Sequence, residues 1–329
     1  MNHHRFVATG EVPPVAAEIL SPYGPIQVAP EPSEQNLIPW MSNTIGLIVR
    51  GDTPITRRII EAGASLRVIG RSGVGYDNVD IDAATARGIP VVYTPGASSR
   101  AVAEGAMAFL LSLAKRLPEL DRETRAGEWK IRDHTRIGDL QGFTLGLVGL
   151  GRIGKEIVSL ARAFDMRVLA YDPYVQGDTL EGVEADLVHL DLLFAESDYI
   201  VLVAPLTEET RGIVTRSLLN AVKPGAIIAN VGRGALFESL DAVYEALQAD
   251  KLAGVGMDVF PEEPPDVSHP IFSHPRTLFT PHALGLSVAA SRNIFVMMSK
   301  GMREVLEGRK PQNVVNPEVF GVHREAKSQ

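Results

Sequence analysis

Residues 144–172 read TLGLVGLGRIGKEIVSLARAFDMRVLAYD, and these residues predict an α/β fold. An apolar segment predicts a strand, a glycine turn follows it, and an amphipathic segment predicts a helix before a second apolar strand. Gly149, Gly151 and Gly154 form the pattern G-x-G-x-x-G, which permits a tight turn, a close approach of backbone to pyrophosphate and close helix–strand packing. Asp172 ends the second strand, where a carboxylate can accept hydrogen bonds from both ribose hydroxyls. The stretch therefore predicts a dinucleotide site, with phosphates at the helix N-terminus.

A second phosphate-binding pattern overlaps this turn and is excluded by one residue. Residues Gly149–Lys155 also fit G-x-x-x-x-G-K, but a nucleotide triphosphate loop then needs Ser or Thr to hold magnesium, and Glu156 follows here. Asp172 also favours NAD over NADP, because a 2′-phosphate beside a carboxylate is electrostatically unfavourable. Pro173 and Tyr174 supply no cation to reverse that preference. We therefore expect NAD as the cofactor and no metal.

The composition excludes several other classes of protein. The 329 residues are 45% hydrophobic and 22% charged, which is typical of a globular protein of two ordinary domains. A net charge of −8 disfavours binding to nucleic acid. The chain has no cysteine, so neither disulfides nor thiolate chemistry are available. No signal peptide or membrane-spanning run is recognisable, and the cytoplasm is the expected location.

Apolar segments alternate with helical patterns along most of the chain, which predicts parallel sheets with helices on both faces. The glycine turn lies deep in the chain, so a separate domain is expected before it. The final helix and the tail must pack somewhere, and a return to the first domain is one economical solution. We expect an α/β protein of two doubly wound domains, residues 1–100 plus 288–329 and residues 101–287, with a ligand cleft between them.

The individual elements follow from the same patterns. The expected strands are Phe6–Thr9, Ile26–Ala29, Ile45–Val49, Leu66–Arg71, Val91–Tyr93, Leu145–Val148, Val168–Tyr171, Tyr199–Val203, Ala226–Asn230, Ala253–Met257 and Leu278–Thr280. The expected helices include Val15–Leu20, Thr56–Ala62, Ile81–Arg87, a long helix from Arg100 to Leu117 that Pro118 ends, and Val288–Leu306.

Three later strands end in residues that can carry chemistry, at the edge where doubly wound sheets bind ligands. Arg233 lies between two glycines and can bind a carboxylate bidentately, although a surface arginine in a turn is an equal alternative. Glu263 lies among prolines that fix its backbone. His282 follows a strand and titrates near neutral pH, so it can give or take a proton, and a neighbouring carboxylate would raise its pKa. The three together favour a catalytic set over isolated structural residues.

With these residues, the chain resembles the D-isomer-specific 2-hydroxyacid dehydrogenase family, and in particular its phosphoglycerate-dehydrogenase-like branch without a regulatory domain. The resemblance extends from about residue 45 to residue 316. It rests on the motifs IGRSGVGYDNVD (69–80), TPGASSRAVAE (94–104), GLGRIG (149–154), APLTEET (204–210), NVGRG (230–234), DVFPEEPP (258–265) and TPH (280–282). It implies a flavodoxin-like substrate domain and a Rossmann NAD-binding domain.

The resemblance also implies a role for each matching residue. Arg233 resembles the arginine that binds the substrate carboxylate and carbonyl, His282 the general acid/base, and Glu263 its partner. Asp258 resembles the residue that meets the nicotinamide carboxamide. The cofactor-binding set that the resemblance implies comprises Gly149, Gly151, Arg152, Ile153, Gly154, Asp172, Ala204, Pro205, Thr210, Val231, Gly232, Arg233, Asp258, His282 and Gly285.

A second set is implied for the substrate. Val74 and Gly75 resemble backbone donors to its carboxylate, a role that also suits a glycine turn before a helix. Arg50 and Arg71 each follow a strand and match positions that hold an acidic, often phosphorylated, substrate; two surface cations are the alternative. Ser98 stands near the substrate where the family often has Asn, which leaves the substrate open. The predicted substrate-binding residues are Arg50, Arg71, Val74, Gly75, Ser98, Arg233 and His282.

We therefore expect an NAD-dependent oxidoreductase that transfers hydride between NAD(H) and a D-2-hydroxy acid or 2-oxo acid, with 3-phosphoglycerate or a similar acidic molecule as a candidate substrate. A glyoxylate or hydroxypyruvate reductase is one alternative. An NAD-sensing interaction protein, like the C-terminal-binding corepressors, is another, and the absence of a basic tail disfavours it. Family members are commonly homodimers joined through the nucleotide domain, so a homodimer is expected, with no nucleic-acid or membrane partner.

Overall fold

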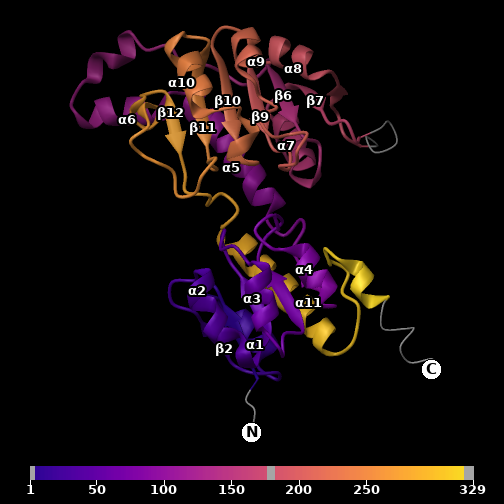
Figure 1. Cartoon of the computed structure of the whole chain (residues 1–329). Coiled ribbons are helices and arrows are strands. Elements are labelled where there is room, and N and C mark those ends of the chain that lie inside the picture. The colour runs from indigo at the N-terminus through magenta and orange to yellow at the C-terminus, as the bar shows by residue number, and fades with distance from the viewer. Residues whose placement is uncertain (1–3, 176–181, 322–329) are drawn as a thin grey trace. The chain divides into compact units, whose positions relative to one another are not determined.

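The structure is a computed structural model that describes residues 4–175 and 182–321, and it forms two units, each with one parallel sheet. The first unit comprises the chain up to Ser98 together with the chain from Leu286 onward, and the second comprises Ser99–Gly285 (Figure 1). Within the described residues, no helix is long and apolar enough to span a membrane.

The first unit has a five-stranded sheet in the order β2-β1-β3-β4-β5, with every neighbouring pair parallel. Its strands are β1 (Arg5–Ala8), β2 (Ile26–Val28), β3 (Thr44–Val49), β4 (Val68–Arg71) and β5 (Val91–Val92). Its helices are α1 (Pro14–Leu20), α2 (Glu34–Leu37), α3 (Arg57–Ala62), α4 (Ile81–Ala86) and α11 (Val288–Leu306), with 3₁₀ turns η1 (Ile38–Asn43) and η6 (Pro317–Phe320).

Both faces of this sheet are buried, as expected for a doubly wound fold. Side chains such as Val7 and Leu47 pack beneath α2, α3 and α4, and their neighbours Phe6 and Ile48 pack beneath α1 and α11. The C-terminal helix α11 thus belongs to the first unit. It approaches β4 closely because Gly70 has no side chain there: a Cβ at Gly70 would lie 2.3 Å from the sulfur of Met302.

The second unit has a seven-stranded parallel sheet in the order β12-β11-β10-β9-β6-β7-β8. Its strands are β6 (Thr144–Val148), β7 (Arg167–Tyr171), β8 (Asp186–Leu187), β9 (Tyr199–Leu202), β10 (Ala226–Asn230), β11 (Leu252–Met257) and β12 (Thr277–Phe279). Its helices are α5 (Ser99–Ala114), α6 (Leu117–Arg125), α7 (Arg152–Ala163), α8 (Leu190–Glu196), α9 (Arg216–Ala221) and α10 (Leu240–Gln248), with 3₁₀ turns η2 (Trp129–Asp133), η4 (Gly234–Leu236) and η5 (Pro270–Ser273).

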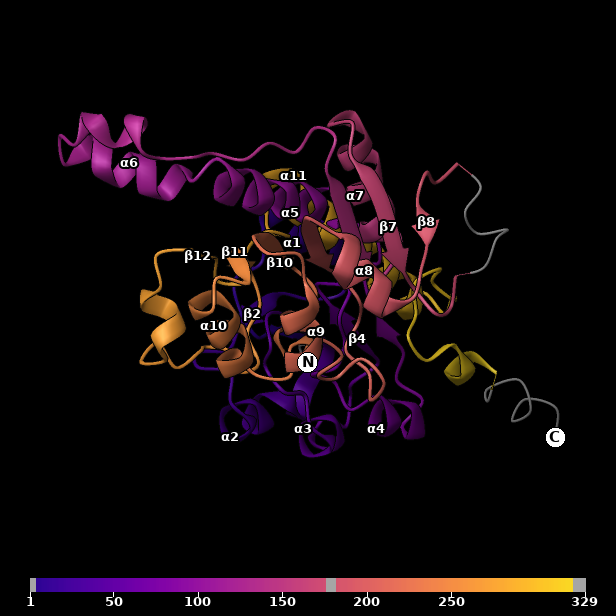
Figure 2. The ribbon, with the colours of Figure 1, turned by 90° about the horizontal axis from the view of Figure 1, so that it is seen from above.

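Helices cover both faces of the second sheet. One face packs against α5 and α7, and the other packs against α8, α9 and α10. Figure 2 shows α6 projecting from the rest of the second unit, and α6 buries none of its own residues. Strand β6 has β7 on one side and β9 on the other, so the chain reverses its direction of winding at β6. In a doubly wound sheet this reversal creates the crevice where ligands bind.

The expected strands are all present, with ends shifted by at most two residues, and α11 has the expected bounds. The expectation that one helix runs to Leu117 and stops at Pro118 is wrong. Helix α5 ends at Ala114, and Arg116 adopts a left-handed conformation (φ 51°) that turns the chain into α6. Pro118 lies in the first turn of α6, where a missing N–H costs nothing, so this proline begins a helix.

Candidate functional site

The glycine turn lies at the carboxyl end of β6, at the reversal of the winding. Gly149 has φ +102°, and a Cβ there would lie 2.8 Å from the amide nitrogen of Ala204, which follows β9. A Cβ at Gly154 would lie 2.5 Å from the carbonyl oxygen of Gly149. Both glycines are therefore required by the backbone itself. They hold the first turn of α7 directly against the end of the sheet.

Gly151 differs from the other two glycines of the turn. A Cβ at Gly151 would meet no atom of the protein within 4 Å, and its φ is −75°, which any residue adopts. Folding therefore does not explain a glycine at this position. An open cradle in front of a helix N-terminus suits a pyrophosphate, whose oxygens need the backbone to come close.

Asp172 joins the end of β7 to the glycine turn. Its Oδ2 accepts the N–H of Leu150 at 2.8 Å, and its Oδ1 accepts the N–H of Tyr174 at 3.0 Å. The carboxylate is thus oriented beside the turn, and each oxygen keeps a second lone pair for a ribose hydroxyl. With the open cradle at Gly151, this arrangement fits the adenosine and pyrophosphate parts of NAD.

Replacing Gly151 with alanine tests the cradle without disturbing the fold. We expect Gly151→Ala to unfold at the wild-type temperature, because the new methyl group meets no protein atom. We expect its Kd for NADH to rise by about tenfold or more, because the methyl group lies where the pyrophosphate approaches the backbone. Calorimetric titration and thermal unfolding measure both effects. Gly154→Ala is the matched control, which should lose stability, and unchanged NADH binding in Gly151→Ala would contradict the assignment.

The loop after β10 presents Arg233. Asn230 holds this loop, since its Nδ2 donates to the carbonyl of Arg233 at 2.9 Å and its Oδ1 accepts the N–H of Gly232 at 3.1 Å. The guanidinium of Arg233 donates to the carbonyl of Gly232 at 2.8 Å and is half-buried. Gly234 allows the loop after β11 to pack directly on this one, because a Cβ there would lie 1.9 Å from the carbonyl carbon of Phe260.

The side chains of His282 and Glu263 form a pair at the carboxyl edge of the second sheet. Nδ1 of His282 lies 2.7 Å from Oε2 of Glu263, and Oε1 of Glu263 accepts the N–H of Phe260 at 2.9 Å. The imidazole side chain is 39% exposed and the carboxylate 21%. Glu263 is therefore fixed by the backbone and holds one ring nitrogen of His282, Nδ1. This geometry suits proton transfer at Nε2.

Asp258 is at the end of β11 and is 3% exposed. Its Oδ1 accepts the hydroxyl of Thr280 at 2.6 Å and the N–H of Ala283 at 2.8 Å, and both oxygens lie 3.3 Å from the amide of Leu284. Burial raises the pKa of Asp258, and these hydrogen bonds offset part of the rise. The sequence patterns gave no sign of the Thr280 contact, although Thr280 stands in the motif that contains His282.

The other predicted cofactor residues lie along the same edge of the second sheet. Arg152 and Ile153 begin α7, and Val231 and Gly232 are buried directly after β10. Ala204, Pro205 and Thr210 follow β9, where the hydroxyl of Thr210 donates to the carbonyl of Pro205 at 2.7 Å. Gly285 is the last residue of the second unit.

The predicted substrate arginines lie at the carboxyl edge of the first sheet. Arg50 follows β3, donates to the carbonyl of Glu11, and stacks its guanidinium over Phe295 at 5.4 Å. Arg71 ends β4 and is only 8% exposed, and its guanidinium donates to the carbonyl of Ser72 at 3.2 Å. The alternative that both arginines are freely solvated surface cations is therefore wrong.

Val74 and Gly75 lie in the turn after β4, and Ser98 is buried after β5. Within residues 4–175 and 182–321, no acceptor is bonded to the amide of Val74 or of Gly75. A helix follows this turn, as expected, but not directly. Helix α4 begins only at Ile81, and the side chain of Asp80 already caps it. Anion binding at this turn would thus rest on the two amides and not on a helix dipole.

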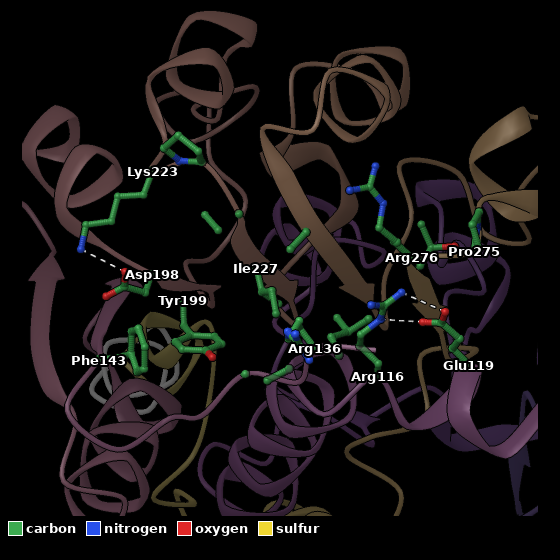
Figure 3. A pocket seen from close by; sticks show the side chains of 18 of the residues that line it. Arg116, Glu119, Arg136, Phe143, Asp198, Tyr199, Lys223, Ile227, Pro275 and Arg276 are labelled. Atoms are coloured by element: carbon green, nitrogen blue, oxygen red, sulfur yellow. Dashed lines mark hydrogen bonds and ion pairs between the residues drawn. The ribbon is translucent and has the colours of Figure 1, made fainter. Parts of the chain in front are cut away.

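A cavity of about 490 Å³ lies at the opposite, amino edge of the second sheet. Its walls include residues at the beginnings of the strands, among them Tyr199, Ala226 and Thr277. Lys223 pairs with Asp198 at 3.0 Å, and Figure 3 shows this pair and the Arg116–Glu119 pair on opposite sides of the cavity. The cavity is therefore separate from the edge that carries the glycine turn.

Tyr199, in the wall of this cavity, leads to a prediction of how the stability of the fold depends on pH. Burial, with Asp198 and Asp139 nearby, raises its pKa to about 12. Between pH 10 and 12 the unfolded chain loses this proton and the folded chain keeps it. Stability should therefore fall by up to about 1.4 kcal/mol per pH unit over that window. The absorbance difference between wild type and Tyr199→Phe should titrate near pH 12, and a midpoint near 10 would contradict the burial argument.

The fold and the carboxyl edge of the second sheet define a two-unit, dinucleotide-binding protein of the doubly wound class. The chain belongs to the D-isomer specific 2-hydroxyacid dehydrogenase family, whose NAD binding domain matches residues 107–283. The second unit is therefore an NAD-binding domain of that family.

Three comparisons show the range of similar proteins. The chain is 38% identical to a D-3-phosphoglycerate dehydrogenase of Methanocaldococcus jannaschii, over 92% of this chain and 57% of the relative. It is 35% identical to a glyoxylate reductase of Korarchaeum cryptofilum, over 88% of each. The TT0316 protein of Thermus thermophilus has the same fold with a TM-score of 0.88 and 34% identity, over 94% of this chain and 99% of that protein. The chain thus spans little more than half of the phosphoglycerate dehydrogenase.

Proposed function

We propose that the chain is an NAD-dependent oxidoreductase that interconverts a D-2-hydroxy acid and the corresponding 2-oxo acid. The observation that carries this proposal is the pair of His282 Nδ1 and Glu263 Oε2, 2.7 Å apart, on the same edge of the same sheet as the glycine turn. An acid/base group and a dinucleotide cradle on one edge are what the oxidation of an alcohol needs.

Each residue has a distinct part in the proposed reaction. Bound NAD would supply the acceptor of hydride, or NADH its donor. His282 takes the hydroxyl proton at Nε2 during oxidation and returns it to the carbonyl oxygen during reduction. Glu263 holds Nδ1, which fixes the orientation of the ring. Arg233 binds the substrate carboxylate and stabilises negative charge at the carbonyl oxygen.

We propose an acidic substrate, with 3-phosphoglycerate as the leading candidate. Arg50, Arg71 and the amides of Val74 and Gly75 gather at one edge of the first sheet and offer two cations and two donors. A phosphate or second carboxylate would match this charge. The similar proteins named above include both a phosphoglycerate dehydrogenase and a glyoxylate reductase, so glyoxylate and hydroxypyruvate are the alternatives.

A panel of substrates tests the proposal. We expect loss of NADH absorbance with at least one 2-oxo acid among phosphohydroxypyruvate, hydroxypyruvate, glyoxylate and pyruvate. We expect kcat/KM for phosphohydroxypyruvate to exceed that for pyruvate by about a hundredfold, because a phosphate adds charge-assisted hydrogen bonds to two arginines. Equal values would contradict the acidic substrate. Tight NADH binding without turnover of any member would favour an NAD-sensing interaction protein.

We further propose a homodimer joined through the second unit and located in the cytoplasm. Three large apolar side chains on or near the projecting α6 are exposed, namely Leu117, Trp129 (66% exposed) and Ile137. Such residues on a segment that buries nothing of its own suit contact with a second copy. Light scattering should give twice the chain mass of 35.5 kDa, and a monomer would contradict the homodimer.

A further inference from the structure

The loop that carries His282 is bonded to Asp258 through both the main chain and the side chain of Asp258. The carbonyl of Asp258 accepts the N–H of His282 at 2.8 Å. Its carboxylate accepts the hydroxyl of Thr280 at 2.6 Å and the N–H of Ala283 at 2.8 Å, and it is 3.3 Å from the N–H of Leu284. Thr280 before His282 and Ala283 after it are thus bonded to one buried carboxylate.

His282 needs such support because its backbone is left-handed, with φ 52°. A residue with a Cβ adopts this conformation rarely, and it persists where surrounding contacts fix it. Pro281 precedes His282 and donates no hydrogen bond itself. The contacts that fix the loop come from the N–H of His282 itself and from Thr280 and Ala283, and all three reach Asp258.

The same strand end also fixes the partner of His282. Asp258 is followed by Val259 and by Phe260, whose N–H is bonded to Oε1 of Glu263 at 2.9 Å. His282 and Glu263 are thus each bonded to backbone that follows β11, and their side chains meet at 2.7 Å. Donation to the buried carboxylate by Thr280 also offsets part of the rise in the pKa of Asp258 that burial causes.

We propose that Asp258 and Thr280 are positioning residues, which hold the backbone of residues 280–284 so that the imidazole of His282 faces Glu263. This inference rests on the proposed function of His282 as the acid/base group. It gives the Asp258 carboxylate a role in ordering the protein itself, beside the contact with the nicotinamide carboxamide that the family resemblance implies.

Removing the hydroxyl of Thr280 tests the proposal. We expect Thr280→Val to lower kcat by about ten- to a hundredfold, because a small displacement of a catalytic group has effects of that size. KM and the Kd for NADH should change by less than about threefold, because the glycine turn and Asp172 lie at other strands. Thr280→Ser, which keeps the hydroxyl, should return kcat to within about threefold of wild type.

Thr277→Val is the matched control at the other end of β12. The hydroxyl of Thr277 donates to the carbonyls of His274 at 2.7 Å and Ile271 at 3.2 Å, so the variant also loses partly buried hydrogen bonds of a threonine. Its kcat should stay at the wild-type value. If Thr277→Val and Thr280→Val lower kcat equally, general destabilisation explains the effect and the proposal is overturned. Should Thr280→Val not fold, Thr280→Ala removes the same hydroxyl with a smaller side chain.

A spectroscopic measurement keeps this inference distinct from the proposed function. In ¹⁵N-histidine-labelled protein, the proton on Nδ1 of His282 should give a downfield signal, assigned by its loss in His282→Gln. We expect that signal in wild type and Thr280→Ser and its loss or broadening in Thr280→Val. Its persistence unchanged in Thr280→Val would overturn the positioning role, even if wild type turned over no 2-oxo acid and the proposed function failed.

Discussion

Replacing His282 with alanine should lower kcat by about 10²- to 10⁴-fold, which is the usual contribution of a general acid/base group. The geometry supports this expectation, since Nδ1 of His282 lies 2.7 Å from Oε2 of Glu263 and the proposed reaction uses Nε2 for the proton. NADH should still bind with a Kd within about threefold of wild type, because the glycine turn and Asp172 do not depend on the imidazole. Single-turnover kinetics and NADH titration measure the two quantities.

The second histidine–carboxylate pair of the same unit supplies the control. Nε2 of His269 lies 3.1 Å from Oδ1 of Asp241, which is in the first turn of α10, and neither residue takes part in the proposed reaction. His269→Ala removes an imidazole from a similar pair and should leave kcat within about twofold of wild type. Near-normal turnover in His282→Ala would sink the acid/base assignment. Equal losses in both variants would point to damage to the fold.

Asp172 should give the second largest effect, a preference for NADH over NADPH of about a hundredfold or more in kcat/KM. The carboxylate is held beside the glycine turn by the amides of Leu150 and Tyr174, so it cannot easily turn away from a 2′-phosphate. The charges then repel each other at close range, where screening by salt is weak. Initial rates with both coenzymes under one set of conditions measure the ratio.

Asp172→Asn separates the charge from the hydrogen bonds. The amide keeps one acceptor oxygen for a backbone N–H and removes the negative charge, so the preference for NADH should shrink by about tenfold or more. Asp186→Asn is the control, because Asp186 is an exposed acid on β8 that pairs with Arg167 at 3.2 Å. Comparable kcat/KM for the two coenzymes in wild type would refute the role given to Asp172.

Most helices and strands were predicted correctly because residues close together in the sequence determine where they form. The turn at Gly149–Gly154 and the strands around it follow from short-range periodicity, and the structure places them within two residues of expectation. The error at Pro118 has a local cause as well. A proline ends one helix or begins the next according to the backbone conformation that precedes it, and no local pattern predicted the left-handed conformation of Arg116, two residues before Pro118.

The arrangement around His282 could not be predicted in the same way. Asp258 and Thr280 are far apart along the chain and meet only because β11 and β12 are neighbours in the sheet. No periodicity encodes which strand ends adjoin, and no local signal predicted the left-handed backbone of His282. The family resemblance implied the partnership of His282 with Glu263, and the structure supplied its geometry.

Residue patterns alone predicted the glycine turn, the NAD cofactor expected from Asp172, the family, and the alternation that builds two parallel sheets. These follow from residue types at short spacing, where backbone conformation and charge act directly. The burial of Arg71 and the hydrogen bonds that the Asp258 carboxylate accepts from the loop of His282 became apparent only in the folded structure. Those features depend on contacts between distant segments, which packing and strand order create after the local elements have formed.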